Sequence, residues 1–289
     1  MDRTEELYRL FLDNFPGIVR EPETARGVFT HPGNHTLLYE QDGTIRAASV
    51  WNVNVLLLLC ADRSVRGRGV GSFLLAETER AIKAAGYDEA RFCDGFSYLT
   101  PGIPIGYPGY ENNRAFFEKR GYVHSWGDCE CVDMKADLTM LPDFGMKTGD
   151  TVRGVTYRFA REDDREAVYA CALDAYKDFA KYYDRAPLYE AGNPERVLLA
   201  ETDGKVVGIL LVAAGCESPE LGSVGCTATR PAYQNRGIAT TMVKLGTASL
   251  AAQGFRTGYL GYTYTDIIPM YARSGYRVCM KYLMGVKKL

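Results

Sequence analysis

The stretch that decides the fold is Gln234-Asn235-Arg236-Gly237-Ile238-Ala239, a short turn that contains glycine. It follows an extended, threonine-rich run at 223–229 and opens a run of apolar residues at helical spacing. Glycine lets a backbone come close to a ligand, and a helix N-terminus offers unpaired N–H groups and a positive dipole end. The turn therefore suits an anion such as a pyrophosphate. The alternative is an ordinary tight turn between a strand and a helix.

The same kind of turn occurs earlier, as Arg66-Gly67-Arg68-Gly69-Val70-Gly71, after an apolar run at 53–60. Each turn is followed by a second related segment: residues 116–122 read FFEKRGY, and residues 270–276 read MYARSGY. The turns lie 168 positions apart and the later segments 154 positions apart. The excess of 14 residues in the first half matches a stretch rich in proline and glycine at 98–110. The sequence therefore predicts two related halves, the first with an insertion.

These paired segments resemble the GNAT superfamily of N-acetyltransferases. In that family the glycine turn binds the pyrophosphate of coenzyme A, and a late helix ends in Tyr-x-x-x-Gly-[Phe/Tyr]. The resemblance implies an α/β fold with two tandem GNAT-like domains, each a mixed, mostly antiparallel sheet flanked by helices, with splayed central strands. We expect an N-terminal domain at 1–140, which could be non-catalytic, and a catalytic domain at 151–289. The layout is similar to that of the mycothiol synthases, an analogy that says little about the substrate.

Composition bounds the remaining possibilities. The chain has 289 residues, 46% hydrophobic and 24% charged, which is typical of globular proteins. A formal net charge of -2 gives no electrostatic case for nucleic acid or for an anionic membrane as a partner. The N-terminus is charged and amphipathic, unlike a signal peptide, and no apolar stretch approaches the roughly 20 residues that span a bilayer. Eight cysteines and three histidines show no metal spacing, so we expect a cytoplasmic protein without a metal, of undetermined oligomeric state.

The resemblance implies a set of residues that bind acetyl-coenzyme A as co-substrate. The strand before the second turn would pair with the pantetheine, and the turn itself would bind the pyrophosphate. The first turn retains the glycine pattern and adds positive charge. The implied contacts are Thr227, Ala228, Thr229, Gln234, Arg236, Gly237, Ile238, Ala239 and Thr240 in the second half, with Arg66, Arg68, Gly69 and Gly71 in the first.

The resemblance also implies a catalytic residue, Tyr271, which would protonate the departing thiolate. The alternative is a core tyrosine. Phe117 occupies the corresponding position of the first half, and a phenyl ring cannot donate a proton, so the second half is the expected catalytic one. Tyr107 or Tyr110, in the inserted stretch, could replace the missing hydroxyl.

A general base is harder to identify. Gly225 and Cys226 stand where the family often has a carboxylate, so Glu217, Glu220, a water molecule or an amine that is already neutral remain as alternatives.

Two further stretches have open interpretations. The prolines and glycines at 98–110 predict an irregular segment, either a surface insertion or a lid or wall over a pocket. Tyr182, Tyr183 and Tyr189 form either one face of an amphipathic helix or a polar-aromatic wall for the acceptor.

The sequence thus predicts an N-acetyltransferase that moves an acetyl group from acetyl-coenzyme A to a primary amine of a small molecule or peptide, by direct attack in a ternary complex. The alternative is a catalytically silent tandem GNAT-like protein that binds acyl-coenzyme A or has a regulatory role. A Rossmann site is excluded because the turn lacks the full G-x-G-x-x-G spacing, and a P-loop because no Gly-Lys-[Ser/Thr] follows.

Overall fold

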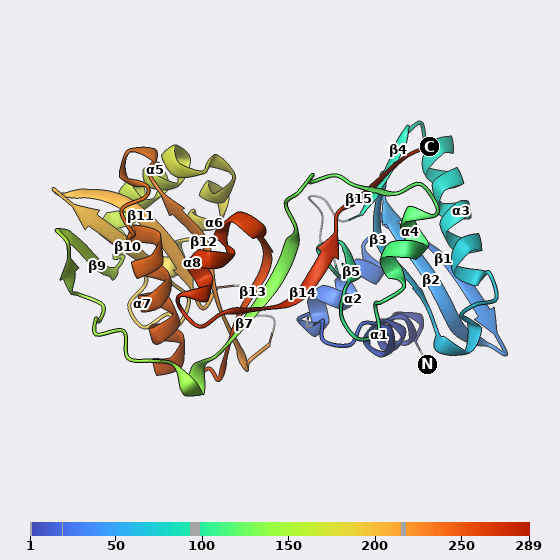
Figure 1. Cartoon of the computed structure of the whole chain (residues 1–289), viewed down its shortest axis with the longest axis horizontal. Coiled ribbons are helices and arrows are strands. Elements are labelled where there is room, and N and C mark those ends of the chain that lie inside the picture. Colours follow the sequence, from blue (N-terminus) through green and yellow to red (C-terminus); the bar gives the residue numbers. More distant parts are fainter. Residues whose placement is uncertain (1, 19, 93–98, 215–217) are drawn as a thin grey trace. The chain divides into compact units, whose positions relative to one another are not determined.

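The computed structural model describes residues 2–18, 20–92, 99–214 and 218–289 (Figure 1). The chain divides into two compact units: unit 1 comprises Met1–Val132 with Met280–Leu289, and unit 2 comprises Asp133–Cys279. The boundaries fall inside two strands, β7 (Cys131–Asp137) and β14 (Arg277–Leu283). Both units are α/β structures with mixed, mostly antiparallel sheets.

Unit 1 is built on a sheet in which β3 and β4 are parallel and the other pairings of its described residues are antiparallel. Helix α3 covers this sheet, and Thr78 on the helix shares a buried hydrogen bond of 2.8 Å with Ser49 on β2. The strand order is β1-β2-β3-β4-β15-β6. The elements are α1 (Arg3–Asn14), α2 (Pro22–Thr30), β1 (His35–Gln41), β2 (Thr44–Asn52), β3 (Val55–Ala61), α3 (Val70–Ala84), β4 (Glu89–Phe92), β5 (Ile103–Ile105), α4 (Asn113–Glu118), β6 (Val123–His124) and β15 (Gly285–Lys288).

The strand β15 joins unit 1 although it follows all of unit 2 in the chain. It pairs with β4 through Lys287↔Ala90 and with β6 through Val286↔Val123, so it fills an interior position of the sheet. Lys287 also forms an ion pair with the largely buried Glu79 of α3. The sequence pattern predicts one strand at 276–285, whereas the structure has β14 and β15 with a break at Met284.

Unit 2 is built on strands in the order β7-β13-β12-β11-β10-β9-β8, with β12 and β13 parallel. Helices α5 and α7 lie on opposite faces, because Ile209 and Leu211 of β11 pack in the α5 core while Leu210 lies against Gly246 of α7. A Cβ on Gly246 would lie 2.5 Å from Leu210, so glycine permits this close packing. The elements are β8 (Thr151–Val152), β9 (Val155–Phe159), α5 (Arg165–Ala175), α6 (Ala180–Tyr183), β10 (Arg196–Thr202), β11 (Lys205–Val212), β12 (Leu221–Thr229), α7 (Ile238–Ala252), β13 (Thr257–Tyr264) and α8 (Ile268–Ala272).

The proline- and glycine-rich stretch contains a short strand, which the sequence analysis did not predict. Within unit 1, β5 pairs antiparallel with the end of β14, Ile105 opposite Lys281 and Ile103 opposite Leu283. A Cβ on Gly102 would lie 2.8 Å from the Leu283 carbonyl oxygen, so the backbones approach closely because this residue is glycine. Pro104 is tolerated because β5 is an edge strand. Tyr98, the first residue of the predicted stretch, lies outside the described residues.

No helix in the described part of the chain is long and apolar enough to cross a membrane. The same residues contain no group of three histidine, cysteine or acidic side chains arranged to hold a metal ion.

Candidate functional site

A pocket of about 580 Å³ opens in unit 2 where two neighbouring parallel strands separate. The parallel pairing of β12 with β13 is confined to Leu221–Ser223 and Thr257–Tyr259. Beyond these pairs, residues 224–227 and residues 260–264 line opposite sides of the pocket. The splayed central strands that the sequence analysis expected therefore form a wedge-shaped opening.

The glycine turn forms the rim of this pocket. Asn235 and Gly237 both have positive φ, 61° and 80°, and Gly237 is the N-cap of α7. The Gln234 side-chain nitrogen Nε2 donates to the Thr229 carbonyl at 3.1 Å, which ties the start of the turn to the end of β12. Of the predicted contacts in this half, seven line the pocket: Thr227, Thr229, Gln234, Gly237, Ile238, Ala239 and Thr240.

Two predicted contacts of the second half are not among the residues that line the pocket. The Arg236 guanidinium donates to the Ala232 carbonyl at 2.8 Å and lies over the Tyr233 ring. The Ala228 side chain belongs to the core beneath α5. A role for either residue in binding would therefore rest on its backbone.

Tyr271 lies inside the pocket. It is 5% exposed, and its hydroxyl is 3.1 Å from Thr227 Oγ1. Burial raises the pKa of Tyr271 to about 12, while the hydrogen bond with Thr227 opposes this shift. The phenol therefore keeps its proton at neutral pH. Its ring also packs against Tyr276 at 6.0 Å, so the residue is part of the core and of the pocket wall at once.

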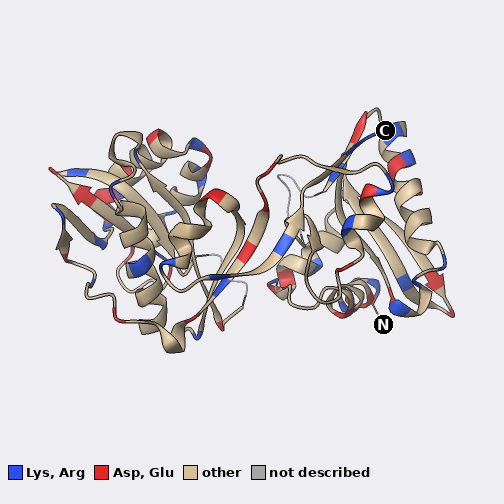
Figure 2. Ribbon diagram, viewed as in Figure 1, with Lys and Arg blue, Asp and Glu red and all other residues tan. Residues whose placement is uncertain are grey.

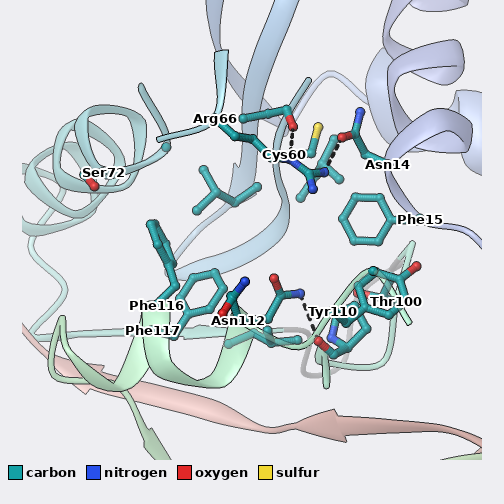
Figure 3. Close-up of a pocket in the computed structure, with 18 of the residues that line it drawn as sticks. Asn14, Phe15, Cys60, Arg66, Ser72, Thr100, Tyr110, Asn112, Phe116 and Phe117 are labelled. Carbon is teal, nitrogen blue, oxygen red and sulfur yellow. Dashed lines mark hydrogen bonds between the residues drawn. The ribbon is translucent and has the colours of Figure 1, made fainter. Parts of the chain in front are cut away.

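The first turn repeats the backbone geometry of the second. Gly67 and Gly69 have φ values of 74° and 85°, and Gly69 is the N-cap of α3. Arg66 Nε donates to the Ala61 carbonyl at 2.8 Å, the counterpart of the bond from Gln234 to Thr229. The second guanidinium contact of Arg66 is new: it reaches Asn14 Oδ1 at the end of α1, 2.6 Å away (Figure 3).

Comparison with known proteins agrees with this geometry. Residues 158–276 match the model of the Acetyltransferase (GNAT) family. The matched segment contains the glycine turn, the separated strands and Tyr271, so the second half is similar to the GNAT acetyltransferases. No curated protein matches the chain.

Solved structures extend the GNAT likeness to the first half. A GCN5-related glucosamine N-acetyltransferase region of a fungal multi-domain β-N-acetylglucosaminidase is similar over 99% of this chain (TM-score 0.76, 16% identity), which spans 37% of that protein. A GCN5-related N-acetyltransferase from Sphaerobacter thermophilus is similar over 98% of this chain and 91% of its own (TM-score 0.71, 19% identity). A tandem GNAT protein from the clavulanic acid biosynthesis pathway is similar over 99% of this chain and 94% of its own (TM-score 0.67, 15% identity). The chain thus shares the tandem α/β fold of these GNAT proteins.

In the first GNAT-like half the corresponding pocket is larger, about 900 Å³. Arg66, Gly69 and Gly71 line it, whereas Arg68 is not among its lining residues. Residues between Thr100 and Asn113 also line it, so the inserted stretch forms one wall (Figure 3). Asn14 and Phe15 of the N-terminal segment line it as well, and no sequence motif marked them.

The first pocket has a phenylalanine ring where the second pocket has a tyrosine hydroxyl. Phe117 lies at the position of Tyr271 and packs edge-on against Phe92 at 4.8 Å. The Tyr110 hydroxyl donates to the Pro16 carbonyl at 2.9 Å, so this bond already uses its proton, and Tyr107 is not among the lining residues. The described walls therefore hold no free phenol in place of the missing one.

The second GNAT pocket has few charged groups. Among the described residues that line it, Arg273 alone carries a charged side chain. Cys226 also lines it, and burial raises the pKa of its thiol to about 11. Glu220 is exposed and is not among the lining residues, and Glu217 lies outside the described residues. Figure 2 shows Lys and Arg positions interspersed with Asp and Glu positions along the ribbons of both units.

The tyrosines at 182–189 divide into two kinds. Tyr183 and Tyr189 are buried, 0% and 5% exposed, and neither is among the lining residues. Tyr182 is exposed and is not among the lining residues. Phe179, three residues before Tyr182, does line the pocket, and the sequence analysis did not single it out.

Proposed function

We propose that the protein is an acetyl-coenzyme A-dependent N-acetyltransferase whose second half acetylates a primary amine of a small molecule or peptide. The observation that carries the proposal is the meeting of three features in one pocket: the separated strands β12 and β13, the left-handed turn at 235–237 and the buried hydroxyl of Tyr271. Each matches a part of the reaction.

The turn supplies the anion site. Amide groups at the start of α7 and the hydroxyl of Thr240 would hold the pyrophosphate, since a helix N-terminus favours negative charge. Nothing within 4 Å would meet a Cβ at Gly237, so the space around this backbone is open.

The chemistry follows from the residues at the wedge. In a ternary complex, the amine nitrogen attacks the thioester carbonyl carbon, the C–S bond breaks and the ammonium proton passes to water. A backbone amide near Thr227 would polarise the carbonyl. Tyr271 would give its proton to the thiolate and recover one from solvent. Burial keeps Tyr271 protonated before the reaction, although its raised pKa also makes the phenol a weaker acid toward the thiolate.

The alternative, a silent protein that binds acyl-coenzyme A, is favoured by one observation in the first half. There Phe117 replaces the proton donor while the turn keeps its conformation. We therefore assign this weaker role to the first half alone: binding without transfer, or support of the fold.

The test is calorimetric titration with acetyl-coenzyme A, together with thiol release in the presence of an amine panel that includes glucosamine, spermidine and a lysine peptide. The matched variants are Gly237→Asp and Gly69→Asp, both at open positions where the new carboxylate would repel a pyrophosphate. We expect Gly237→Asp to abolish thiol release and Gly69→Asp to retain it. Binding without thiol release by the wild type would favour the silent protein, and no binding would overturn both functions.

A further inference from the structure

The wedge in unit 2 begins with two unusual backbone conformations. The last parallel pair joins Ser223 of β12 to Tyr259 of β13. Three residues further along each strand stands a non-glycine residue with positive φ: Cys226 at 48° and Tyr262 at 55°. Both line the pocket. Residues other than glycine rarely adopt this backbone conformation unless their surroundings hold them there.

Cys226 is held from the α6 side. Tyr183 is fully buried, and its hydroxyl donates to the Cys226 carbonyl oxygen at 2.6 Å. The Tyr189 hydroxyl in turn donates to the carbonyl of Tyr183 at 2.9 Å. The phenol of Tyr183 is thus a fixed donor against the irregular part of β12.

This bond fixes more than one carbonyl. The register of β12 against β11 steps from Ala228 to Gly225 while β11 moves from Ile209 to Leu211, so Cys226 and Thr227 form a bulge. In a trans peptide the C=O and the next N–H point in opposite directions. Holding the Cys226 carbonyl therefore also holds the N–H of Thr227, the residue whose hydroxyl meets Tyr271.

Tyr262 is held by a buried carboxylate from another part of the sequence. Asp133 on β7 is 2% exposed. Its Oδ1 accepts from the Tyr262 N–H at 3.0 Å, and its Oδ2 accepts from the Tyr259 hydroxyl at 2.7 Å. One carboxylate therefore bridges the last paired residue of β13 and the first irregular one.

We infer that Tyr183 and Asp133 are positioning residues that keep β12 and β13 apart and orient the Thr227 amide in the wedge. Neither touches the reacting atoms. The inference rests on the proposed function for its kinetic consequences, while the strand geometry that it explains can be measured without any turnover.

The first experiment compares Tyr183→Phe with Tyr189→Phe, two substitutions that each remove one buried hydroxyl from the same cluster. Tyr183→Phe should lower kcat roughly 10- to 100-fold, as a slight misplacement of reacting groups does, with the KM for acetyl-coenzyme A near its wild-type value. Tyr189→Phe should keep kcat within a few-fold. If both variants lose thermal stability but keep the same kcat per calorimetrically counted site, the positioning role of Tyr183 is overturned.

The second experiment compares Asp133→Ala with Asp133→Asn. The alanine removes the acceptor, whereas the asparagine oxygen can still accept from the Tyr262 amide. Amide hydrogen exchange over residues 259–264 should quicken in Asp133→Ala and return toward the wild-type rate in Asp133→Asn, and kcat should follow the same order. Unchanged exchange in Asp133→Ala overturns the inference even if the wild type shows no turnover, so its failure is distinct from failure of the proposed function.

Discussion

The two glycine turns have the same backbone, but the strands that lead into them do not. Gly67 and Asn235 take left-handed φ values of 74° and 61°, and Gly69 and Gly237 take 85° and 80°. By contrast, no residue of β3 has positive φ, whereas β12 has Cys226 at 48°. The turn is a local structure that two or three residues specify. The wedge in unit 2 requires distant side chains, and the described residues of β3 show no such irregular backbone.

The largest effect is expected from removing β15, which should abolish cooperative folding of unit 1 while unit 2 stays folded. A chain ending at Met284 lacks the strand that lies between β4 and β6, together with the partner of Glu79. Unit 1 should lose cooperative folding, because an interior strand and its hydrogen bonds disappear. Hydrogen exchange should show lost protection in β4 and β6 and retained protection in β10 and β11. Equal loss in both units would show that their stabilities are not separable.

The next effect tests which half reacts. Tyr271→Phe should lower kcat on the order of 100-fold, because a general acid of this kind contributes at least that much. Acetyl-coenzyme A affinity should change little, since the ring remains in place. The reciprocal variant Phe117→Tyr should leave kcat unchanged. A wild-type rate in Tyr271→Phe would remove this hydroxyl from the mechanism, and restored activity in the double variant would move catalysis to the first half.

A smaller effect concerns alkaline pH and the ionisation of Tyr271. Burial raises the pKa of Tyr271 to about 12, above about 10 for an exposed tyrosine. Its contribution to stability is therefore complete below about pH 10 and is lost as the pH rises toward 12. Over this pH range, the midpoint temperature of thermal unfolding should fall more for the wild type than for Tyr271→Phe. A parallel decline of both proteins would contradict the shifted pKa.

The smallest effect exchanges the residues at the first left-handed position. Gly67→Asn and Asn235→Gly should each change the free energy of unfolding by less than about 1 kcal/mol, because both residue types tolerate this conformation. Nothing within 4 Å would obstruct a side chain at Gly67. Gly67→Val should cost clearly more, since a β-branched residue is a rare outlier at positive φ. Chemical denaturation measures all three, and equal values for Asn and Val would show that the turn is not left-handed.

The parts of the fold that the sequence predicted are those with local causes. Glycine or asparagine at left-handed positions and an apolar helix after them specify each turn, and the repeat spacing located the insertion. The family resemblance then indicated which residues to expect around Tyr271. Seven of the nine expected in the second half line its pocket, whereas Ala228 and Arg236 do not. In the first half Arg68 is likewise not among the residues that line the other pocket.

What the sequence did not predict depends on long-range pairing. Residues 103–105 are a strand because β14 lies beside them, not because of their composition. Asp133 lies 126 positions from Tyr259, whose hydroxyl donates a hydrogen bond to it, and no motif connects the two residues. In the sequence, nothing distinguishes Tyr183 from the other tyrosines of its cluster. The structure does, because Tyr183 is buried and Tyr182 is exposed. Tertiary contacts decide such cases.

The interior position of β15 has a consequence for synthesis on the ribosome. Most of unit 1 leaves the ribosome first, but its sheet lacks an inner strand until residues 285–288 follow, after the whole of unit 2 has been made. Ordinarily, N-terminal domains fold first during translation. Here β4 and β6 must remain without their partner while unit 2 emerges. Unit 1 therefore cannot complete its sheet until all of unit 2 has been synthesised.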